Sequence, residues 1–274
     1  MHKMLFTLIC ICSLSFGQSG PQVILEDLQF PEGPAVNAEG VLFFSDIPPR
    51  LVYRYAAEEL TVFLDSTGGA NGLAFDAQDR LVACAGKARH VFRLEPDGSR
   101  TILADSYNGK KLNSPNDLWI DPHGGIYFTD PRYGSTDDLE QDGMHVYYLQ
   151  PGAKKLIRVI DHLTRPNGII GTPDNQTLYV VDEGERQTWQ YRIGKNGKVT
   201  DKTLFCNGGI DGLALTDKGG LVVTMENAVR LFTPAGEQLK SWPFENNPTN
   251  VCFAEGLLYV TTQGGRVYHI HLGQ

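Results

Sequence analysis

Short apolar stretches alternate with turn-forming residues along most of the chain, and one pattern recurs. Within residues 116–131, an apolar strand over 118–120 is followed by a turn over 121–125, a second apolar strand over 126–128 and an acidic exit at Asp130. Two short apolar runs joined by a tight turn are typical of a β-hairpin. This hairpin is a unit against which the other segments can be aligned.

Six copies of the hairpin follow one another at intervals of about 40 to 50 residues, the size of a propeller blade made of four short strands. The copies begin with EGPAV at Glu32, NGLAF at Asn71, NDLWI at Asn116, NGIIG at Asn167, DGLAL at Asp211 and, more weakly, TNVCF at Thr249. Helical periodicity is nearly absent. The pattern therefore predicts an all-β fold, a six-bladed β-propeller.

Further strands rich in β-branched and aromatic residues lie between the copies and complete each blade. They cover 51–56, 90–95, 145–150, 188–193, 229–234 and 266–272. An early strand over 22–28 precedes the first copy. We expect it to join the last blade as its outer strand, which would close the ring and remove an open sheet edge.

Composition agrees with a single large sheet-rich domain over residues 18–274. The chain is 41% hydrophobic and contains 30 Gly and 15 Pro, as expected for many short strands and tight turns. The formal net charge of -8 argues against nucleic acid or an anionic membrane as a partner. Nothing in the sequence indicates an oligomeric state.

Residues 1–17 differ from the rest of the chain. His2 and Lys3 precede the apolar run MLFTLICICSLSF, and the following Gly17 suits cleavage before Gln18. This pattern predicts a signal peptide and a periplasmic or secreted protein without a stable membrane anchor. An uncleaved anchor is the alternative, although the run is shorter than the roughly 20 residues that span a bilayer.

The usual catalytic and cofactor motifs are absent: there is no G-x-S-x-G, no HEXXH, no phosphate-binding loop and no dinucleotide fingerprint. The mature chain keeps three widely spaced cysteines, Cys84, Cys206 and Cys252, which allow at most one disulfide. Cys84 and Cys252 lie in apolar runs, so buried free thiols are favoured. The seven histidines are scattered, and each is treated as a surface or packed residue.

The first residue of each hairpin copy is the best candidate for chemistry. In a propeller the innermost strands begin at the same end of the central channel, so equivalent residues point toward one axis. All six carry a side-chain oxygen: Glu32, Asn71, Asn116, Asn167, Asp211 and Thr249. Carboxylate and amide oxygens without Cys or His suit a hard divalent cation such as Ca²⁺, Mg²⁺ or Mn²⁺. The sequence thus predicts a metal site in the channel, in which not all six need be ligands.

A purely structural interpretation of these residues is the alternative. Asn-Gly and Asp-Gly are strong turn formers, so Asn71, Asn167 or Asp211 could serve only to turn the chain. The hairpin turns themselves come several residues later in every copy. The coincidence of acids and amides at one position therefore favours function.

With these motifs, the chain resembles the gluconolactonase family that also contains regucalcin, the senescence marker protein, and most closely its bacterial gluconolactonase branch. The matching segments are PEGPAV at 31–36, LNSPNDLWIDPHGGIYFTDPRYG at 112–134, RPNGII at 165–170, IDGLAL at 210–215 and PTNVCF at 248–253. The resemblance spans nearly the whole mature chain. It implies a six-bladed propeller with one divalent metal in the channel and hydrolysis of a sugar lactone such as glucono-1,5-lactone.

By position, the resemblance places the metal ligands at Glu32, Asn167 and Asp211, with Asn116 close to the metal or the substrate. Asp211 matches the residue usually proposed as general base. Asn71 is kept as a substrate contact and Thr249 is left out. Ca²⁺ is the expected cation, with Mg²⁺, Mn²⁺ or Zn²⁺ as alternatives.

One departure concerns the substrate. Regucalcin-like members have an arginine two residues before the asparagine that corresponds to Asn116, where this chain has Ser114. A positive contact would have to come from elsewhere, with Arg132 or Arg165 as candidates and a solvated surface arginine as the alternative for either. Tyr133 is a further, weaker candidate for holding substrate hydroxyls.

Two other functions stay open at this stage. A non-catalytic propeller could bind a sugar or a protein partner and use the metal as a structural clip, and the same scaffold could host an esterase or phosphotriesterase. The acidic segment 135–143 is interpreted as a solvated loop, with a lid over the channel as the alternative.

Overall fold

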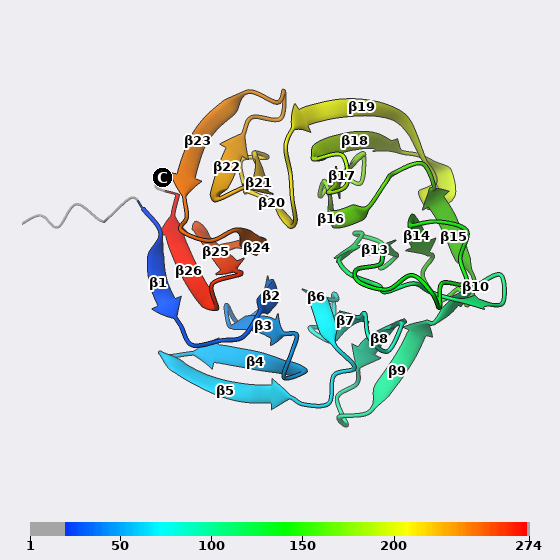
Figure 1. Cartoon of the computed structure of the whole chain (residues 1–274), viewed down its shortest axis with the longest axis horizontal. Coiled ribbons are helices and arrows are strands. Elements are labelled where there is room, and N and C mark those ends of the chain that lie inside the picture. Colours follow the sequence, from blue (N-terminus) through cyan, green and yellow to red (C-terminus); the bar gives the residue numbers. More distant parts are fainter. Residues whose placement is uncertain (1–19, 273–274) are drawn as a thin grey trace, which may run out of the picture.

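The computed structural model describes residues 20–272, and its six four-stranded antiparallel sheets are arranged as blades around a central channel (Figure 1). The predicted six-bladed all-β propeller is confirmed. Within the described residues there is no α-helix, only a 3₁₀ turn over Lys195–Gly197, and no helix long and apolar enough to cross a membrane. The predicted signal peptide, residues 1–17, lies outside the described residues.

The strands follow the predicted repeats, and each blade is numbered in chain order from its innermost strand. Blade 1 contains β2 (Pro31–Val36), β3 (Leu42–Asp46), β4 (Leu51–Ala56) and β5 (Glu59–Leu64); blade 2 contains β6 (Ala70–Phe75), β7 (Leu81–Ala85), β8 (His90–Leu94) and β9 (Arg100–Ala104). Blade 3 contains β12 (Leu118–Ile120), β13 (Ile126–Asp130), β14 (His145–Leu149) and β15 (Leu156–Ile160); blade 4 contains β16 (Pro166–Gly171), β17 (Thr177–Asp182), β18 (Gln187–Ile193) and β19 (Val199–Asn207). Blade 5 contains β20 (Leu213–Leu215), β21 (Leu221–Met225), β22 (Ala228–Phe232) and β23 (Gln238–Pro243); blade 6 contains β24 (Pro248–Ala254), β25 (Leu257–Thr262) and β26 (Arg266–His271). A small hairpin of β10 (Ser106–Tyr107) and β11 (Lys110–Lys111) connects blades 2 and 3.

The ring closes through β1 (Gln22–Leu25), which is the outer strand of blade 6 and pairs antiparallel with β26. Gln22 lies opposite His269, and their side chains are hydrogen-bonded at 2.9 Å between Oε1 and Nε2. Figure 1 shows the dark-blue β1 beside the red β26. The expected closure by the early strand is therefore confirmed, and β1 covers the edge of β26 that would otherwise be open.

The hydrophobic core is a ring of six clusters, one at each interface between neighbouring blades. Between blades 2 and 3, for example, Val82 and Val91 pack with Phe128 and Tyr147, all buried. The remaining clusters join blades 3 and 4, 5 and 6, 1 and 2, 4 and 5, and 6 and 1. Because apolar burial is the main favourable term in folding, the blades stabilise one another rather than a common centre, and polar groups can occupy the channel.

The three cysteines of the described chain are free. Cys84 is fully buried in the cluster between blades 2 and 3, and burial raises the pKa of its thiol well above the ordinary value. Cys206 and Cys252 are half-buried. The expectation of unbridged thiols in apolar strands agrees with this arrangement.

Candidate active site

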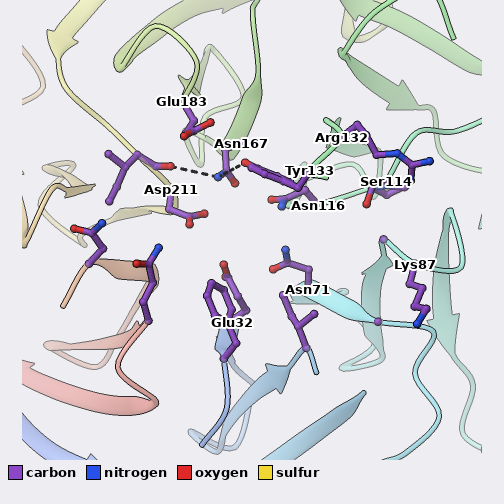
Figure 2. A pocket seen from close by; sticks show the side chains of 18 of the residues that line it. Glu32, Asn71, Lys87, Ser114, Asn116, Arg132, Tyr133, Asn167, Glu183 and Asp211 are labelled. Atoms are coloured by element: carbon purple, nitrogen blue, oxygen red, sulfur yellow. Dashed lines mark hydrogen bonds between the residues drawn. The ribbon is translucent and has the colours of Figure 1, made fainter. Parts of the chain in front are cut away.

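A cavity of about 750 Å³ opens at the end of the channel where the innermost strands begin. Seven of its lining residues are the site residues expected from the sequence: Glu32, Asn71, Asn116, Arg132, Tyr133, Asn167 and Asp211. Figure 2 shows Glu32, Asn71, Asn116, Asn167 and Asp211 converging on one space from different blades. The first positions of the repeats therefore meet as the propeller geometry requires.

Thr249 is the exception among the six equivalent positions. Its side chain is fully buried, and its hydroxyl donates a hydrogen bond to the Pro31 carbonyl at 2.6 Å. It does not line the cavity. The propeller geometry alone predicted a sixth oxygen from Thr249, and this is wrong because the hydroxyl is used to join blade 6 to blade 1.

An irregularity in the strand pairing aims the site residues into the cavity. The register shifts between Glu32 and Ala35, between Ala70 and Leu73, and between Pro166 and Ile169. A bulge interrupts the alternation of side chains and re-aims the residue beside it. The site residues of blades 1, 2 and 4 are therefore set by bulges.

The glycine after the site residue has a packing role in blades 4 and 5. A Cβ atom on Gly168 would overlap the Asp211 carbonyl, and one on Gly212 would overlap the Asn250 side chain. Neither glycine has a positive φ. The alternative that Asn167-Gly168 and Asp211-Gly212 are there only as turn formers is wrong, since the glycines allow neighbouring inner strands to approach closely.

Three aspartates, here called the clamp aspartates, hold the chain just before the site residues of blades 1, 3 and 4. They end the second strands of these blades, and each carboxylate accepts two backbone N–H bonds. The bonds run from Gln29 and Phe30 to Asp46 (3.1 and 2.7 Å), from Asn113 and Ser114 to Asp130 (2.8 and 2.7 Å), and from Thr164 and Arg165 to Asp182 (3.0 and 2.8 Å). The second donor always lies two residues before the site residue. These aspartates were missed as positioning groups, although their recurrence in SDI, TDP and VDE was visible in the aligned copies.

The two acids of the cavity floor lie close enough to influence each other. Burial raises the pKa of Glu32 to about 8, and the charge of Asp117 adds to the shift, while the Gly33 N–H at 3.0 Å and the Asn250 side chain oppose it. Burial and the charge of Glu32 raise the pKa of Asp211 well above its ordinary value. Both carboxylates therefore lose their protons less readily than ordinary acids. A bound cation would favour their ionised forms, as a nearby opposite charge does.

A second layer of polar residues lies beneath the floor. Asn250 accepts the Val251 N–H at 2.7 Å through its side-chain oxygen, so its amide nitrogen is the donor to the carboxylates of Glu32 and Asp117. Burial raises the pKa of Asp117 to about 6. Both residues occupy the position that is glycine in the other four copies, which is the signal by which the sequence could have revealed them.

The floor also contains acceptor oxygens without a partner. Asn167 donates through Nδ2 to the Tyr133 hydroxyl at 2.9 Å and to the Ile210 carbonyl at 3.3 Å, and its buried Oδ1 has no hydrogen bond. The buried Oδ1 of Asn71 also lacks one. Unpaired buried acceptors are costly unless a ligand satisfies them. Beside two acids, these oxygens match the donor set of a hard divalent cation. No group of three His, Cys, Asp or Glu that could hold a metal occurs among the described residues, so the amides are essential to this fit.

Tyr133 closes one side of the cavity. The residue is 45% exposed, and the centre of its ring lies 5.4 Å from the Arg165 guanidinium, while its hydroxyl accepts a hydrogen bond from Asn167. Loss of solvation at the hydroxyl and the charge of Asp211 raise the pKa of this phenol, which therefore stays protonated. Arg165 is paired with Glu183 at 2.9 Å and does not line the cavity.

Arg132 lines the cavity but is committed to the loop 135–143. Its guanidinium donates to the Asn113 carbonyl at 3.2 Å and forms an ion pair with Asp138, which also pairs with Arg89 at 3.1 Å. Further along the loop, Gln141 donates to carbonyls of the β10–β11 hairpin. The loop is thus anchored beside the mouth, and none of its described residues lines the cavity.

Comparison with known proteins decides the family. The model of the SMP-30/Gluconolactonase/LRE-like family matches residues 30–264. The chain belongs to this family. The gluconolactonase of Zymomonas mobilis is 30% identical over 85% of this chain and 76% of its own length.

Solved structures agree with this membership of the gluconolactonase family. A gluconolactonase from Xanthomonas campestris superposes with a TM-score of 0.85 at 32% identity, covering 92% of this chain and 89% of that one. A calcium-binding protein, regucalcin, from Agrobacterium tumefaciens has a TM-score of 0.74 at 20% identity over 92% of both chains, which shows the shared fold. The resemblance inferred from the sequence is therefore confirmed.

Proposed function

We propose that this protein is a metal-dependent hydrolase, a lactonase that opens a sugar lactone such as glucono-1,5-lactone. Membership of the gluconolactonase family supports the lactone-hydrolysing activity. The observation that carries the metal-dependent form is the cavity floor, where the buried Glu32 and the half-buried Asp211 meet the unpaired Oδ1 of Asn167. The predicted signal peptide extends the proposal to action in the periplasm or outside the cell.

Glu32, Asn167 and Asp211 would hold the cation, with Asn116 next to it. Ca²⁺ is the first choice because all donors are hard oxygens and no His or Cys lines the floor. The name of the Agrobacterium tumefaciens relative, a calcium-binding protein, points the same way. Mg²⁺, Mn²⁺ and Zn²⁺ remain alternatives that the metal assay separates.

A divalent cation in this position supplies Lewis acidity toward the lactone carbonyl. Asp211 acts as the general base that takes a proton from the attacking water, since its carboxylate faces the cavity beside the proposed cation. Asn167 fixes the orientation of Tyr133 by donating to its hydroxyl. The water oxygen bonds to the carbonyl carbon, the ring C–O bond breaks, and the ring oxygen leaves as a hydroxyl by taking the proton held on Asp211. The carbonyl carbon becomes a carboxylic acid, which ionises to the carboxylate of the product and releases one proton.

The remaining lining residues would bind the sugar. Asn71 offers an unpaired side-chain oxygen, and Asn116 and the protonated Tyr133 face the same space. These groups suit the hydroxyls of a polyol ring, because amides and phenols both donate and accept hydrogen bonds. Arg132 contributes from the rim while it remains paired with Asp138.

The test is hydrolysis of glucono-1,5-lactone by the mature chain, followed by proton release after chelation and after return of each cation separately. Asp211→Asn is expected to lower kcat by about 10²- to 10⁴-fold at saturating cation, the usual contribution of a general base. Asp217→Asn, an exposed aspartate six residues later, is the matched control and should leave turnover unchanged.

Turnover of Asp211→Asn within about twofold of wild type would remove Asp211 from the base role, since a lost general base costs far more. Tight cation binding without turnover of any lactone would instead favour another ester or phosphotriester substrate, or a binding module with a structural metal.

A further inference from the structure

The charged residues around the mouth of the cavity are paired on one side only. On the side of blades 4 and 5, Glu183 is paired with Arg165 at 2.9 Å, and Glu226 with Arg186 at 2.8 Å. On the side of blades 1 and 2, the lining residues Arg50 and Lys87 are both exposed. Within the described chain, neither side chain has an ion pair or a hydrogen bond.

Arg50 has two counterparts in equivalent turns, Arg89 and Arg186, and both of these have a partner. Arg50, Arg89 and Arg186 all end the turn between the second and third strands of a blade, and all have a positive φ, of 60°, 61° and 52°. Arg89 and Arg186 each reach forward to an acid of the following blade, Asp138 and Glu226. Arg50 has no such acid ahead of it, because blade 2 presents Lys87 along this rim.

Arg50 and Lys87 flank the same short connection between blades 1 and 2. The Arg50 carbonyl accepts the Thr67 N–H at 3.2 Å, and a Cβ atom on Gly69 would lie 2.9 Å from the Lys87 Cβ. Gly69 itself lines the cavity. Figure 2 shows Lys87 on the side of Ser114 and Arg132, away from Asp211. The two cations therefore border one sector of the mouth.

The sector bordered by Arg50 and Lys87 keeps its positive charge when the charges of the cavity floor are balanced. A divalent cation balances the charges of Glu32 and Asp211, and the ion pairs balance Glu183, Glu226 and the remaining rim arginines. In a protein of net charge -8, two exposed cations without counter-charges form a local positive patch, and such a patch at the mouth of a cavity attracts an anion. The open sector and the floor belong to the same cavity.

We propose that the lactone this protein hydrolyses carries an anionic group, a carboxylate or a phosphate, which Arg50 and Lys87 bind at the mouth while the ring carbonyl lies at the floor. The proposal rests on the proposed lactonase function and specifies its substrate class. Arg50 offers a planar fork of donors and Lys87 a point charge, and both bind carboxylate and phosphate oxygens well. Neutral sugar lactones would use the floor alone.

The kinetic test compares kcat/KM for glucono-1,5-lactone, its 6-phosphate and the lactone with a carboxylate at C6, at fixed ionic strength with the cation saturating. One anionic lactone should exceed the neutral one by about 10-fold or more, the value of one charge-assisted hydrogen bond, and the two anionic arms show whether carboxylate or phosphate is preferred. Lys87→Ala combined with Arg50→Ala should reduce the anionic-to-neutral ratio at least 10-fold, and Lys87→Arg should retain most of it. Lys218→Ala, an exposed lysine outside the cavity, should leave the ratio unchanged.

Binding provides a readout that does not depend on turnover. Calorimetry of the cation-loaded protein with gluconate, 6-phosphogluconate and glucarate should show a tighter Kd for one of the two ligands that carry a second anionic group, and the double variant should lose this preference. Equal hydrolysis of all lactones, with ratios unaffected in the double variant, would overturn the anionic substrate while leaving lactonase function intact. Absence of any hydrolysis together with selective anion binding would overturn the lactonase and keep the anion site, whereas no selective binding would overturn the site.

Discussion

Blades 1, 3 and 4 differ from blades 2, 5 and 6 in how they hold the residue that each contributes to the channel. In the first group a clamp aspartate, Asp46, Asp130 or Asp182, binds two backbone N–H groups just ahead of the site residue. In the second group the equivalent strand ends are Ala85, Met225 and Thr262, and no carboxylate is there. The clamped blades supply Glu32, Asn116 and Asn167, so backbone fixation coincides with three of the four proposed metal-site residues.

The unclamped blades position side chains by contacts inside the channel or leave them free. Asp211 is held through a hydrogen bond with the Asn167 side chain, and blade 6 supplies Asn250 to the carboxylates of Glu32 and Asp117. Asn71 of blade 2 has neither a clamp nor a partner for its Oδ1. This difference agrees with the proposed roles, in which the clamped residues hold the cation and Asn71 contacts the substrate.

The largest expected effect comes from removing a clamp. Asp182→Ala leaves the N–H groups of Thr164 and Arg165 unpaired, and we expect the free energy of unfolding to fall by about 2 to 4 kcal/mol, with weaker cation binding. Thr262→Val at the equivalent place in blade 6 removes one hydroxyl hydrogen bond and should cost about 1 kcal/mol. Denaturant unfolding of both variants measures the difference, and equal losses would contradict the comparison.

A smaller effect is expected from pH on the metal-free protein. Burial raises the pKa values of Asp130 to about 7, of Asp117 to about 6 and of Glu32 to about 8. A carboxyl whose pKa is raised on folding stabilises the fold when protonated, and that contribution is lost as the pH rises through the folded value. Stability without cation should therefore fall steadily between pH 5 and pH 8.5.

Added Ca²⁺ should reverse this trend, because the cation binds the ionised carboxylates and its stabilisation grows as they lose their protons. Thermal unfolding at fixed ionic strength, with and without Ca²⁺, measures both slopes. A metal-free protein that becomes more stable toward pH 8.5 would show that the floor acids do not have raised pKa values.

The smallest expected effects distinguish Asn250, which donates to the buried acids, from Asn71, the proposed substrate contact. Asn250→Ala removes the donor to Glu32 and Asp117, so cation affinity should fall about 10-fold, equivalent to one hydrogen bond to a charged group. Asn71→Ala should change cation affinity by less than about twofold and raise KM for the lactone instead. Calorimetry and steady-state kinetics on both variants give the comparison, which fails if Asn71→Ala weakens the cation as much as Asn250→Ala.

Much of the architecture could be predicted because every blade of a propeller repeats a similar pattern of strands and turns in the sequence. The hairpin copies located the innermost strands, and the unpaired strand over 22–28 indicated the closure with blade 6. The convergence of Glu32, Asn167 and Asp211 followed from symmetry alone. These features depend on periodic patterns, which a single sequence displays directly.

The remaining features depend on side-chain directions that no period encodes. Thr249 occupies a site position yet turns into the interface with blade 1, and Asn250 beside it enters the channel. A register shift between Pro248 and Asn250 separates the two, and alternation along a regular strand does not predict it. Likewise, the ion pair between Arg132 and Asp138 was not predicted, because Asp138 lies in a loop whose path the sequence did not reveal.

The pairing of β1 with β26 also determines when the molecule can be completed during its synthesis. Residue 22 leaves the ribosome among the first of the described chain, and its partner, residue 269, among the last. β1 therefore cannot pair until almost all of the chain has been made, and blade 6 cannot be completed while the chain is still growing. The ring of blades therefore stays open until the final strands have been made.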